Sequence, residues 1–153
     1  MTYAILHNIR SIYNVASIFR TADGLGVDTL FLSGYTPAPV DRFGRERDRF
    51  KKVALGAGKI VSWESVDDVF AQMQQLRQEG VSIIACEPVA EAVDYKEIPA
   101  KEDVCLIFGN EPDGLEQDII DESDAVIEIQ MQGEKSSLNV SVAFGIIAAH
   151  FAA

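Results

Sequence analysis

Short apolar runs that resemble β-strands alternate with segments of helical pattern along the whole chain, and this alternation is the strongest constraint on the fold. The strand-like runs are YAIL, TLFLS, KIVSW, VSIIAC, VCLIF and AVIEI. Helices are predicted from about Asn14, from about Val66, near Leu115 and from about Leu138. Strands separated by helices form βαβ units, in which a mostly parallel sheet has helices on both faces. We therefore predict a single α/β domain over residues 1–153.

Local residue types predict where the helices begin and end. Asn14 and Ser65 belong to the types that cap helix N-termini, and Gly80 can adopt the left-handed conformation that ends a helix. In the first helix the apolar side chains recur with the helical period, at Val15, Ile18, Phe19, Ala22 and Leu25. Ser17, Arg20 and Thr21 fall outside this apolar stripe, so Arg20 is expected at the polar side of the helix.

Two stretches without a regular pattern, 34–52 and 87–102, are long for connections within a compact domain and are therefore expected to be functional or mobile. The first contains RFGRERDRFKK (42–52), with six basic and two acidic residues and a net charge of +4 in a chain of net charge −11. Positive potential of this kind attracts phosphates. The segment predicts RNA contacts through Arg42, Arg45, Arg47, Arg49, Lys51 and Lys52, although a solvated surface segment is the alternative.

The cysteines and histidines predict neither a disulfide framework nor a metal site. Cys86 and Cys105 each lie in an apolar run, where a thiol is usually a small buried side chain. His7 and His150 are far from them and lack ligand spacing, so both are expected to be structural or surface residues. No run approaches the roughly 18 apolar residues that cross a bilayer, and the N-terminus has no signal-peptide pattern. We expect a cytoplasmic protein without membrane contact.

The final predicted helix, LNVSVAFGIIAAHFA, is apolar on nearly every side after Ser141. A helix with one solvated face should show a polar stripe. We therefore expect this helix to be buried both on the sheet and on a second copy of the chain, in a homodimer. Burial within one subunit is the alternative.

Three segments combine residue types that are suited to a binding or catalytic site. NVASIFRTADGLG (14–26) is a helix that carries an arginine outside its apolar stripe. LIFGNEPDGL (106–115) is a buried strand that runs into a glycine-rich turn, where Gly109 allows close approach. IEIQMQGEKSSLNVSVAFG (127–145) is a strand, a loop with paired serines and a helix. Each segment alone also fits an ordinary helix, turn or N-cap.

Taken together and in this order, the three segments resemble the signature motifs of the SpoU branch of the SPOUT methyltransferases. The resemblance covers essentially the whole chain. The matching positions are Asn14, Arg20, Thr21 and Ala22; Gly109, Glu111, Gly114 and Leu115; and Ile129, Met131, Gly133 and the run SLNVSVA at 137–143. The chain departs from the family at Ala16, usually glycine, and at Gln130, usually proline.

The resemblance implies a methyltransferase that uses S-adenosylmethionine to methylate a ribose 2′-hydroxyl of tRNA or rRNA. It implies a deep trefoil knot in the C-terminal part of the chain. Cofactor binding is expected at Glu87, Gly109, Ile129, Met131, Gly133, Ser137 and Leu138. Catalytic roles are expected for Arg20, Asn14, Glu111, Ser137 and Asn139, with Arg20 reaching the cofactor of the partner subunit.

Arg20 is expected to act through the positive charge of its guanidinium group. A guanidinium with a pKa above about 12 is a poor general base. We therefore expect Arg20 to orient a phosphate and stabilise the developing alkoxide, with direct proton abstraction assisted by a phosphate as the alternative.

Two other classes of function remain open from the sequence. An RNA-binding protein that kept this fold and lost catalysis is suggested by Ala16, Gln130 and the acidic remainder of the chain. An enzyme that acts on a small nucleotide would leave the basic segment merely solvated. No G-x-G-x-x-G sequence opens a helix, which argues against an ordinary dinucleotide site.

Overall fold

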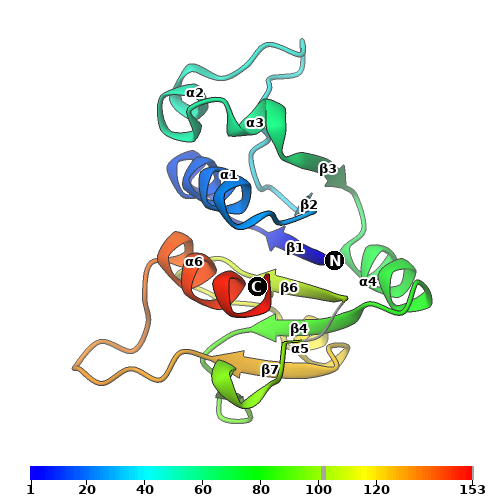
Figure 1. The fold of residues 1–153 in the computed structure, drawn as a ribbon, viewed down its shortest axis with the longest axis vertical. Coiled ribbons are helices and arrows are strands. Elements are labelled where there is room, and N and C mark those ends of the chain that lie inside the picture. Colours follow the sequence, from blue (N-terminus) through cyan, green and yellow to red (C-terminus); the bar gives the residue numbers. More distant parts are fainter. Residues whose placement is uncertain (101–102, 153) are drawn as a thin grey trace.

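The computed structural model describes residues 1–100 and 103–152, and it shows a seven-stranded sheet of order β3-β2-β1-β6-β4-β7-β5 (Figure 1). Every neighbouring pair of strands is parallel. The strands are β1 (Thr2–His7), β2 (Thr29–Ser33), β3 (Ser62–Val66), β4 (Ser82–Cys86), β5 (Val93–Asp94), β6 (Val104–Phe108) and β7 (Ala125–Glu128). The helices are α1 (Ile12–Leu25), α2 (Asp48–Ala54), α3 (Ala57–Ile60), α4 (Val69–Gln78), the 3-10 turn η1 (Tyr95–Glu97), α5 (Gln117–Asp121) and α6 (Val140–Phe151).

Helices cover both faces of the sheet, which confirms the predicted α/β class. Alternate residues of the central strand β6 point to opposite faces. Leu106 and Phe108 contribute to the core beneath α1 and α6, while Ile107 contributes to the core beneath α4 and α5. The rings of Phe108 and Phe144 lie 5.3 Å apart. Burying one such side chain stabilises the fold by about 1.5–3 kcal/mol, which explains why the central strands are apolar throughout.

The predicted N-caps were wrong, and the structure shows why. Helix α1 begins two residues before Asn14, and Ser11 caps it by accepting a hydrogen bond from the Asn14 backbone N–H at 3.2 Å. Ser65 belongs to β3, and Asp68 caps α4 by accepting from two backbone N–H groups. The side chain of Asn14 is therefore available for another partner. Gly80 follows the last turn of α4 with φ +87°, as predicted.

The two irregular stretches contain more regular structure than predicted. Helix α2 occupies the end of the first stretch and extends beyond it, and Lys59 and Ile60 of the predicted strand KIVSW belong to α3. The second stretch contains β5 and η1. Residues 101–102 at its end lie outside the described part of the chain. The predicted helices near Leu115 and Leu138 begin two residues later than expected, at Gln117 and Val140.

Helix α6 is buried on one side and exposed on another. Its buried residues are Val140, Phe144, Ile147, Ala148 and Phe151. It packs beside α1, where a Cβ added to Gly145 would lie 3.5 Å from the Thr21 methyl group. Val142 and Ile146 remain 50% and 37% exposed. One subunit therefore does not cover every apolar face of this helix.

No helix in the described ranges is long and apolar enough to cross a membrane.

Candidate active site

A cavity of about 310 Å³ lies at the edge of the sheet where β4, β6 and β7 end. Because the strands are parallel, the loops that leave their carboxyl ends converge there, as expected for ligand sites in open α/β sheets. The cavity is lined by residues 86–88, 108–114 and 127–129, by Met131, Ser136, Ser137 and Leu138, and by the α6 residues Val140, Ala143 and Ile147.

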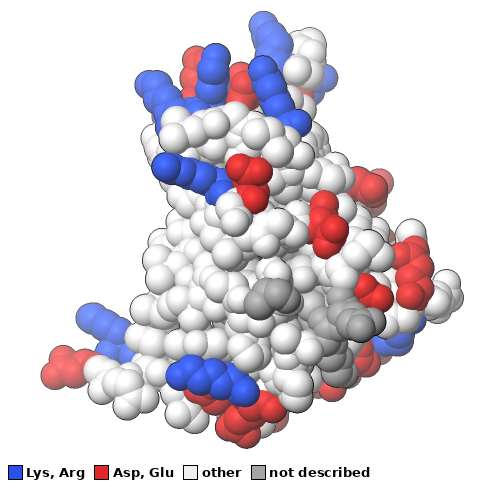
Figure 2. All heavy atoms as spheres, in the orientation of Figure 1, with Lys and Arg blue, Asp and Glu red and all other residues white. Residues whose placement is uncertain are grey.

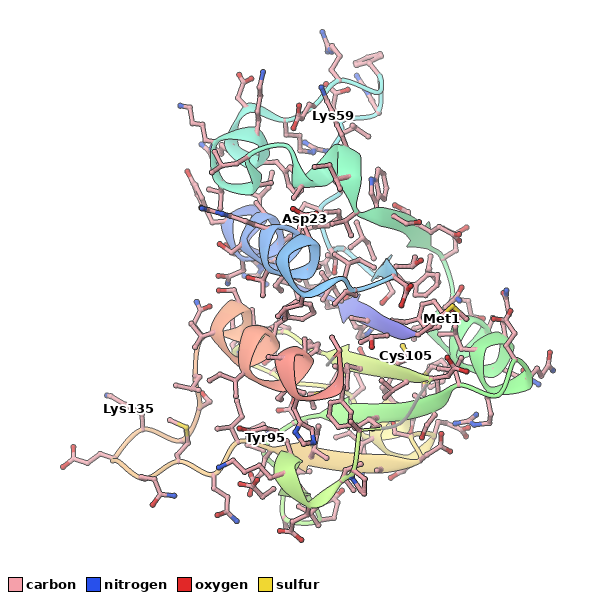
Figure 3. All side chains as sticks on the ribbon, viewed as in Figure 1. Met1, Asp23, Lys59, Tyr95, Cys105 and Lys135 are labelled. Atoms are coloured by element: carbon pink, nitrogen blue, oxygen red, sulfur yellow. The ribbon has the colours of Figure 1, made fainter. Side chains whose placement is uncertain are left out.

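Six of the seven predicted cofactor residues line this cavity: Glu87, Gly109, Ile129, Met131, Ser137 and Leu138. Gly133 does not. It belongs to the segment between β7 and α6, which projects from the body of the protein with Lys135 near its tip (Figure 3). Its cofactor role stays a prediction, as do the roles of the other six.

Glu87 connects two of the loops that form the cavity. Its Oε2 atom accepts a hydrogen bond from the backbone N–H of Leu115 at 3.1 Å. Burial raises the pKa of the Glu87 carboxyl above its usual range, and this hydrogen bond partly opposes the shift. Gly114 adopts φ +69°, and a Cβ added there would lie 2.3 Å from Glu87 Oε1. Glycine is favoured here by the positive φ, and a larger residue would also displace the Glu87 carboxylate.

Gly109 occupies a second crowded position in the same wall. A Cβ at this residue would lie 2.9 Å from the backbone carbonyl carbon of Gly114 and 2.8 Å from Cδ2 of Leu115. The close approach of the two backbone segments keeps the turn 109–115 folded tightly, so that it forms a wall of the cavity.

Asn14, Glu111 and Asn139, three of the predicted catalytic residues, form one hydrogen-bonded chain. The Asn14 side-chain amide donates to Glu111 Oε1. Asn139 Nδ2 donates to Asn14 Oδ1 at 3.2 Å, and Asn139 Oδ1 accepts from the backbone N–H of Ser141 at 2.9 Å as the N-cap of α6. Glu111 also lines the cavity. The chain ties α1, the turn after β6 and the start of α6 together at the cavity.

Arg20 does not join this chain. It is exposed on α1, and in the described part of the protein it has no hydrogen bond or ion pair and does not line the cavity. It follows Asn14 by six residues, so the two side chains are separated by about 120° around the helix axis. Ser137 lines the cavity and is exposed. Within one subunit, the structure therefore brings together four of the five predicted catalytic residues.

The six basic residues of 42–52 are all exposed, in the loop after β2 and on α2. In the face shown in Figure 2, Lys and Arg side chains gather at the end of the molecule that carries α2 and α3, while the rest of the face is mostly uncharged, with acidic side chains mainly along one side and at the opposite end. Two of the arginines are held locally. Arg45 pairs with Asp41 at 3.2 Å, and Arg47 donates to the carbonyl oxygen of Ala38 at 3.2 Å.

Asn110 and Tyr35 are site residues that the sequence analysis did not identify. The Asn110 side chain is 6% exposed, lines the cavity and donates a hydrogen bond to the Tyr35 hydroxyl. The available signal for Asn110 was a polar residue two positions after the last residue of a buried strand. Nothing in the sequence indicated its partner, which lies 75 residues earlier in the chain.

The histidines and cysteines form no candidate metal centre. His7 is buried, with Nδ1 2.8 Å from the Ser33 hydroxyl. Cys86 and Cys105 are free thiols, and burial raises the pKa of both above the usual range, so both stay protonated at neutral pH. Across residues 1–100 and 103–152, no group of three or more His, Cys, Asp or Glu side chains is arranged to hold a metal ion.

Comparison with known proteins decides the family. A profile of the SpoU rRNA Methylase family matches residues 1–149. The chain belongs to this family. The SpoU chain is 32% identical over 140 residues to the tRNA (guanosine(18)-2'-O)-methyltransferase of Aquifex aeolicus, covering 92% of this chain and 63% of that protein. It is 29% identical to the 23S rRNA (guanosine-2'-O-)-methyltransferase RlmB of Neisseria meningitidis, covering 94% of this chain and 54% of the relative. It thus spans roughly half to two thirds of these relatives' length.

Solved structures of the family agree with the fold. An AdoMet-bound rRNA methyltransferase from Sinorhizobium meliloti superposes with a TM-score of 0.86 at 29% identity, covering 96% of this SpoU chain and 54% of that structure. A structure concerned with 2-OH methylation of C/U34 on tRNA superposes with a TM-score of 0.80 at 26% identity. That match covers 97% of this chain and 91% of the other, so the shared fold accounts for nearly all of that chain.

Proposed function

We propose that this SpoU-family protein transfers a methyl group from S-adenosylmethionine to a ribose 2′-hydroxyl of tRNA or rRNA. The observation that carries the proposal is the cavity at the ends of β4, β6 and β7, where six residues at the family's cofactor positions meet. The named relatives methylate guanosine in tRNA and in 23S rRNA. Residues 1–153 act as one methyltransferase domain in this proposal.

The cavity fits a nucleoside cofactor. Its volume of about 310 Å³ lies at the lower end of the roughly 300–1,000 Å³ that is usual for small-molecule sites. Glu87 offers a carboxylate to hydroxyl groups, and Ile129 and Leu138 offer apolar surface to a ring. When bound, S-adenosylmethionine supplies a methyl group that its sulfonium already activates, so the protein's task is to orient the ribose oxygen and assist loss of its proton.

Asn14, Glu111 and Asn139 position the site in this mechanism. Their hydrogen bonds fix the turn after β6 against the start of α6, on two sides of the cavity. Holding reactants in line lowers a barrier by up to about 7–11 kcal/mol in favourable cases. Gly133 keeps the projecting segment adaptable at the cofactor, and Ser137 donates its hydroxyl there.

Arg20 completes the site from a second copy of the chain. Two features support a homodimer: Arg20 has no partner among the described side chains of its own subunit, and the apolar side chains of Val142 and Ile146 are exposed on α6. In this arrangement the guanidinium orients a phosphate and stabilises the alkoxide that forms on the ribose. No metal takes part.

The RNA lies across the basic segment in this proposal. Its net charge of +4 contrasts with a whole-chain charge of −11, so phosphates are attracted there and repelled elsewhere. The six basic residues Arg42, Arg45, Arg47, Arg49, Lys51 and Lys52 contact the backbone.

We also propose a C-terminal trefoil knot and a cytoplasmic location. The knot is supported by the position of β6 between β1 and β4, and by the return of the chain after β7 to pack α6 beside α1. Pulling the two termini apart should then give a contour length shorter than that of an unknotted chain. The location is supported by the free thiols, and cell fractionation tests it.

The function is tested by transfer of labelled methyl from S-adenosylmethionine to purified tRNA and rRNA, followed by mapping of 2′-O-methyl sites. Label at a discrete ribose position in one RNA class is the expected result. A protein that binds RNA but shows no cofactor binding by calorimetry at millimolar S-adenosylmethionine would instead be the catalytically inactive RNA-binding protein that Ala16 and Gln130 suggest.

A further inference from the structure

Phe43 presents an exposed aromatic ring at the tip of the basic segment. Its side chain is 66% exposed. The tip is closed by an antiparallel bridge between Val40 and Glu46 and by a backbone hydrogen bond from Asp41 N–H to the Arg45 carbonyl at 2.8 Å. Exposing an apolar phenyl ring to water is unfavourable, so the position of Phe43 at a loop tip needs a physical explanation.

The Asp41 carboxylate holds the tip in one conformation. Its Oδ1 atom accepts from the backbone N–H groups of Phe43 at 2.8 Å and Arg45 at 3.1 Å. Its Oδ2 atom accepts from Arg45 Nε at 3.2 Å. Gly44 supplies the left-handed residue of the turn, with φ +77°. The ring is thus presented by an organised turn, although the turn is in solvent.

Two guanidinium groups flank the ring. The Cζ atoms of Arg42 and Arg45 lie 4.8 and 5.0 Å from the centroid of Phe43, within cation–π range. These two guanidinium groups make the surroundings of Phe43 cationic, and its sequence neighbours Arg42 and Gly44 add no apolar side chain. A nucleotide offers both a flat base for the ring and an anionic phosphate for the guanidinium groups beside it.

We propose that Phe43 is a stacking platform for an unpaired base of the RNA substrate, with Arg42 and Arg45 contacting the phosphates beside that base. This inference rests on the proposed function. Unpaired bases in RNA loops are commonly recognised by stacking on aromatic rings and on guanidinium planes. A base in a duplex is already stacked and cannot reach the ring. The platform therefore selects RNA with an unpaired nucleotide near the methylated ribose.

The test compares binding of a stem–loop RNA with 2-aminopurine in its loop and of a blunt duplex of equal length. Phe43→Ala should weaken stem–loop binding by about 5- to 150-fold, the range for loss of one stacked base, and leave duplex binding unchanged. Phe43→Trp should retain binding and quench 2-aminopurine fluorescence. Because stacking releases no counterions, Phe43→Ala should keep the salt dependence of the wild type, whereas Arg45→Gln should reduce the log–log slope by about 0.7.

Phe70→Ala is the matched control, because Phe70 is also exposed, at 40%, but lies on α4 away from the basic segment. It should bind both RNAs as the wild type does. Equal stem–loop binding by Phe43→Ala and wild type, equal losses on both RNAs, or a change of oligomeric state in Phe43→Ala would overturn the inference. A wild-type protein that binds neither RNA and transfers no methyl would overturn the proposed function itself.

Discussion

The side-chain amide of Asn14 donates a hydrogen bond to the carboxylate of Glu111, 97 residues further along the chain. Asn139 Nδ2 donates to Asn14 Oδ1, so one residue from each of the three motif segments 14–26, 106–115 and 127–145 meets at one point. This relationship explains why an asparagine is needed in the first turn of α1, where it neither caps the helix nor enters the core. Because Asn14 donates and Glu111 accepts, the pair also allows an experiment in which the donor and acceptor roles are exchanged.

Replacing Asn14 by aspartate should lower methyl transfer by about 10- to 100-fold. The change removes the donor and sets two carboxylates in contact, and a hydrogen bond to a charged group contributes about 1.5–3 kcal/mol. The double variant Asn14→Asp/Glu111→Gln restores a donor and an acceptor with their roles exchanged, and should recover much of the activity. Single-turnover transfer measures both. A double variant no more active than Asn14→Asp alone would contradict a positioning role for the pair.

Arg20→Ala should reduce turnover by about 10²- to 10³-fold, the scale for losing one preorganised donor at a developing oxyanion. Its side chain is exposed, so the unfolding free energy should change by no more than about 0.5 kcal/mol. Arg20→Lys should recover activity only partly, because it keeps the charge and loses the planar fork. Cofactor affinity, measured by calorimetry, should match that of the wild type.

Mixing subunits tests whether Arg20 acts across the dimer. A heterodimer of one Arg20→Ala chain and one Gly114→Ala chain should regain activity at a single site, because one cavity is intact and faces the other chain's arginine. Each homodimer should be impaired at both of its sites, the Arg20→Ala homodimer in turnover and the Gly114→Ala homodimer in cofactor binding. A mixture with no more activity than the two homodimers would show that Arg20 serves its own subunit.

Gly114→Ala should destabilise the fold by about 1–3 kcal/mol, the cost of a strained left-handed residue, and weaken cofactor binding. The added Cβ would meet the Glu87 carboxylate at 2.3 Å. Gly24→Ala is the control. A Cβ at Gly24 has no neighbour within 4 Å, and alanine favours a helix interior by up to about 1 kcal/mol. Urea unfolding of both variants, with cofactor titration, separates strain at the cavity from a general effect of losing glycine.

Glu87→Gln should change the pH dependence of stability. Because burial raises the pKa of Glu87, the folded protein holds this proton more tightly than the unfolded chain. That stabilisation is complete below the unfolded pKa and is lost as the pH rises through the raised folded pKa. Glutamine does not titrate, so it causes no such loss of stability, and its side-chain oxygen can still accept the hydrogen bond from the Leu115 N–H. The variant should therefore gain stability relative to wild type as the pH rises from acid to neutral, and a pH-independent difference in urea midpoints would contradict this.

Charged substitutions at two adjacent isoleucines of α6 should have different effects on folding and dimerisation. Ile146 is 37% exposed and Ile147 is 2% exposed. Ile146→Glu should yield a folded monomer, while Ile147→Glu should prevent folding by burying an unpaired charge among core residues. Light scattering and circular dichroism distinguish the two outcomes. A folded wild-type monomer at micromolar concentration would end the dimer proposal.

The sequence by itself determined the fold class and the family. Runs such as VCLIF and VSIIAC are apolar throughout because both faces of a parallel strand are buried, and this pattern is visible without coordinates. The second and third motifs identified two of the segments that line the cavity, because loops at the carboxyl ends of parallel strands must lie at the same edge of the sheet.

The tertiary structure alone decided which side chains meet. Asn14 looked like a helix cap because cap residues are recognised by type, and only the position of Ser11 and Glu111 in space frees it for another role. The Asn110–Tyr35 hydrogen bond and the crowding at Gly114 likewise depend on segments distant in sequence. That Arg20 is exposed and does not line the cavity of its own subunit was likewise decided by the packing of α1. Hydrophobic periodicity fixes which residues are buried, but the relative placement of loops is set by packing across the whole sheet, which no local pattern encodes.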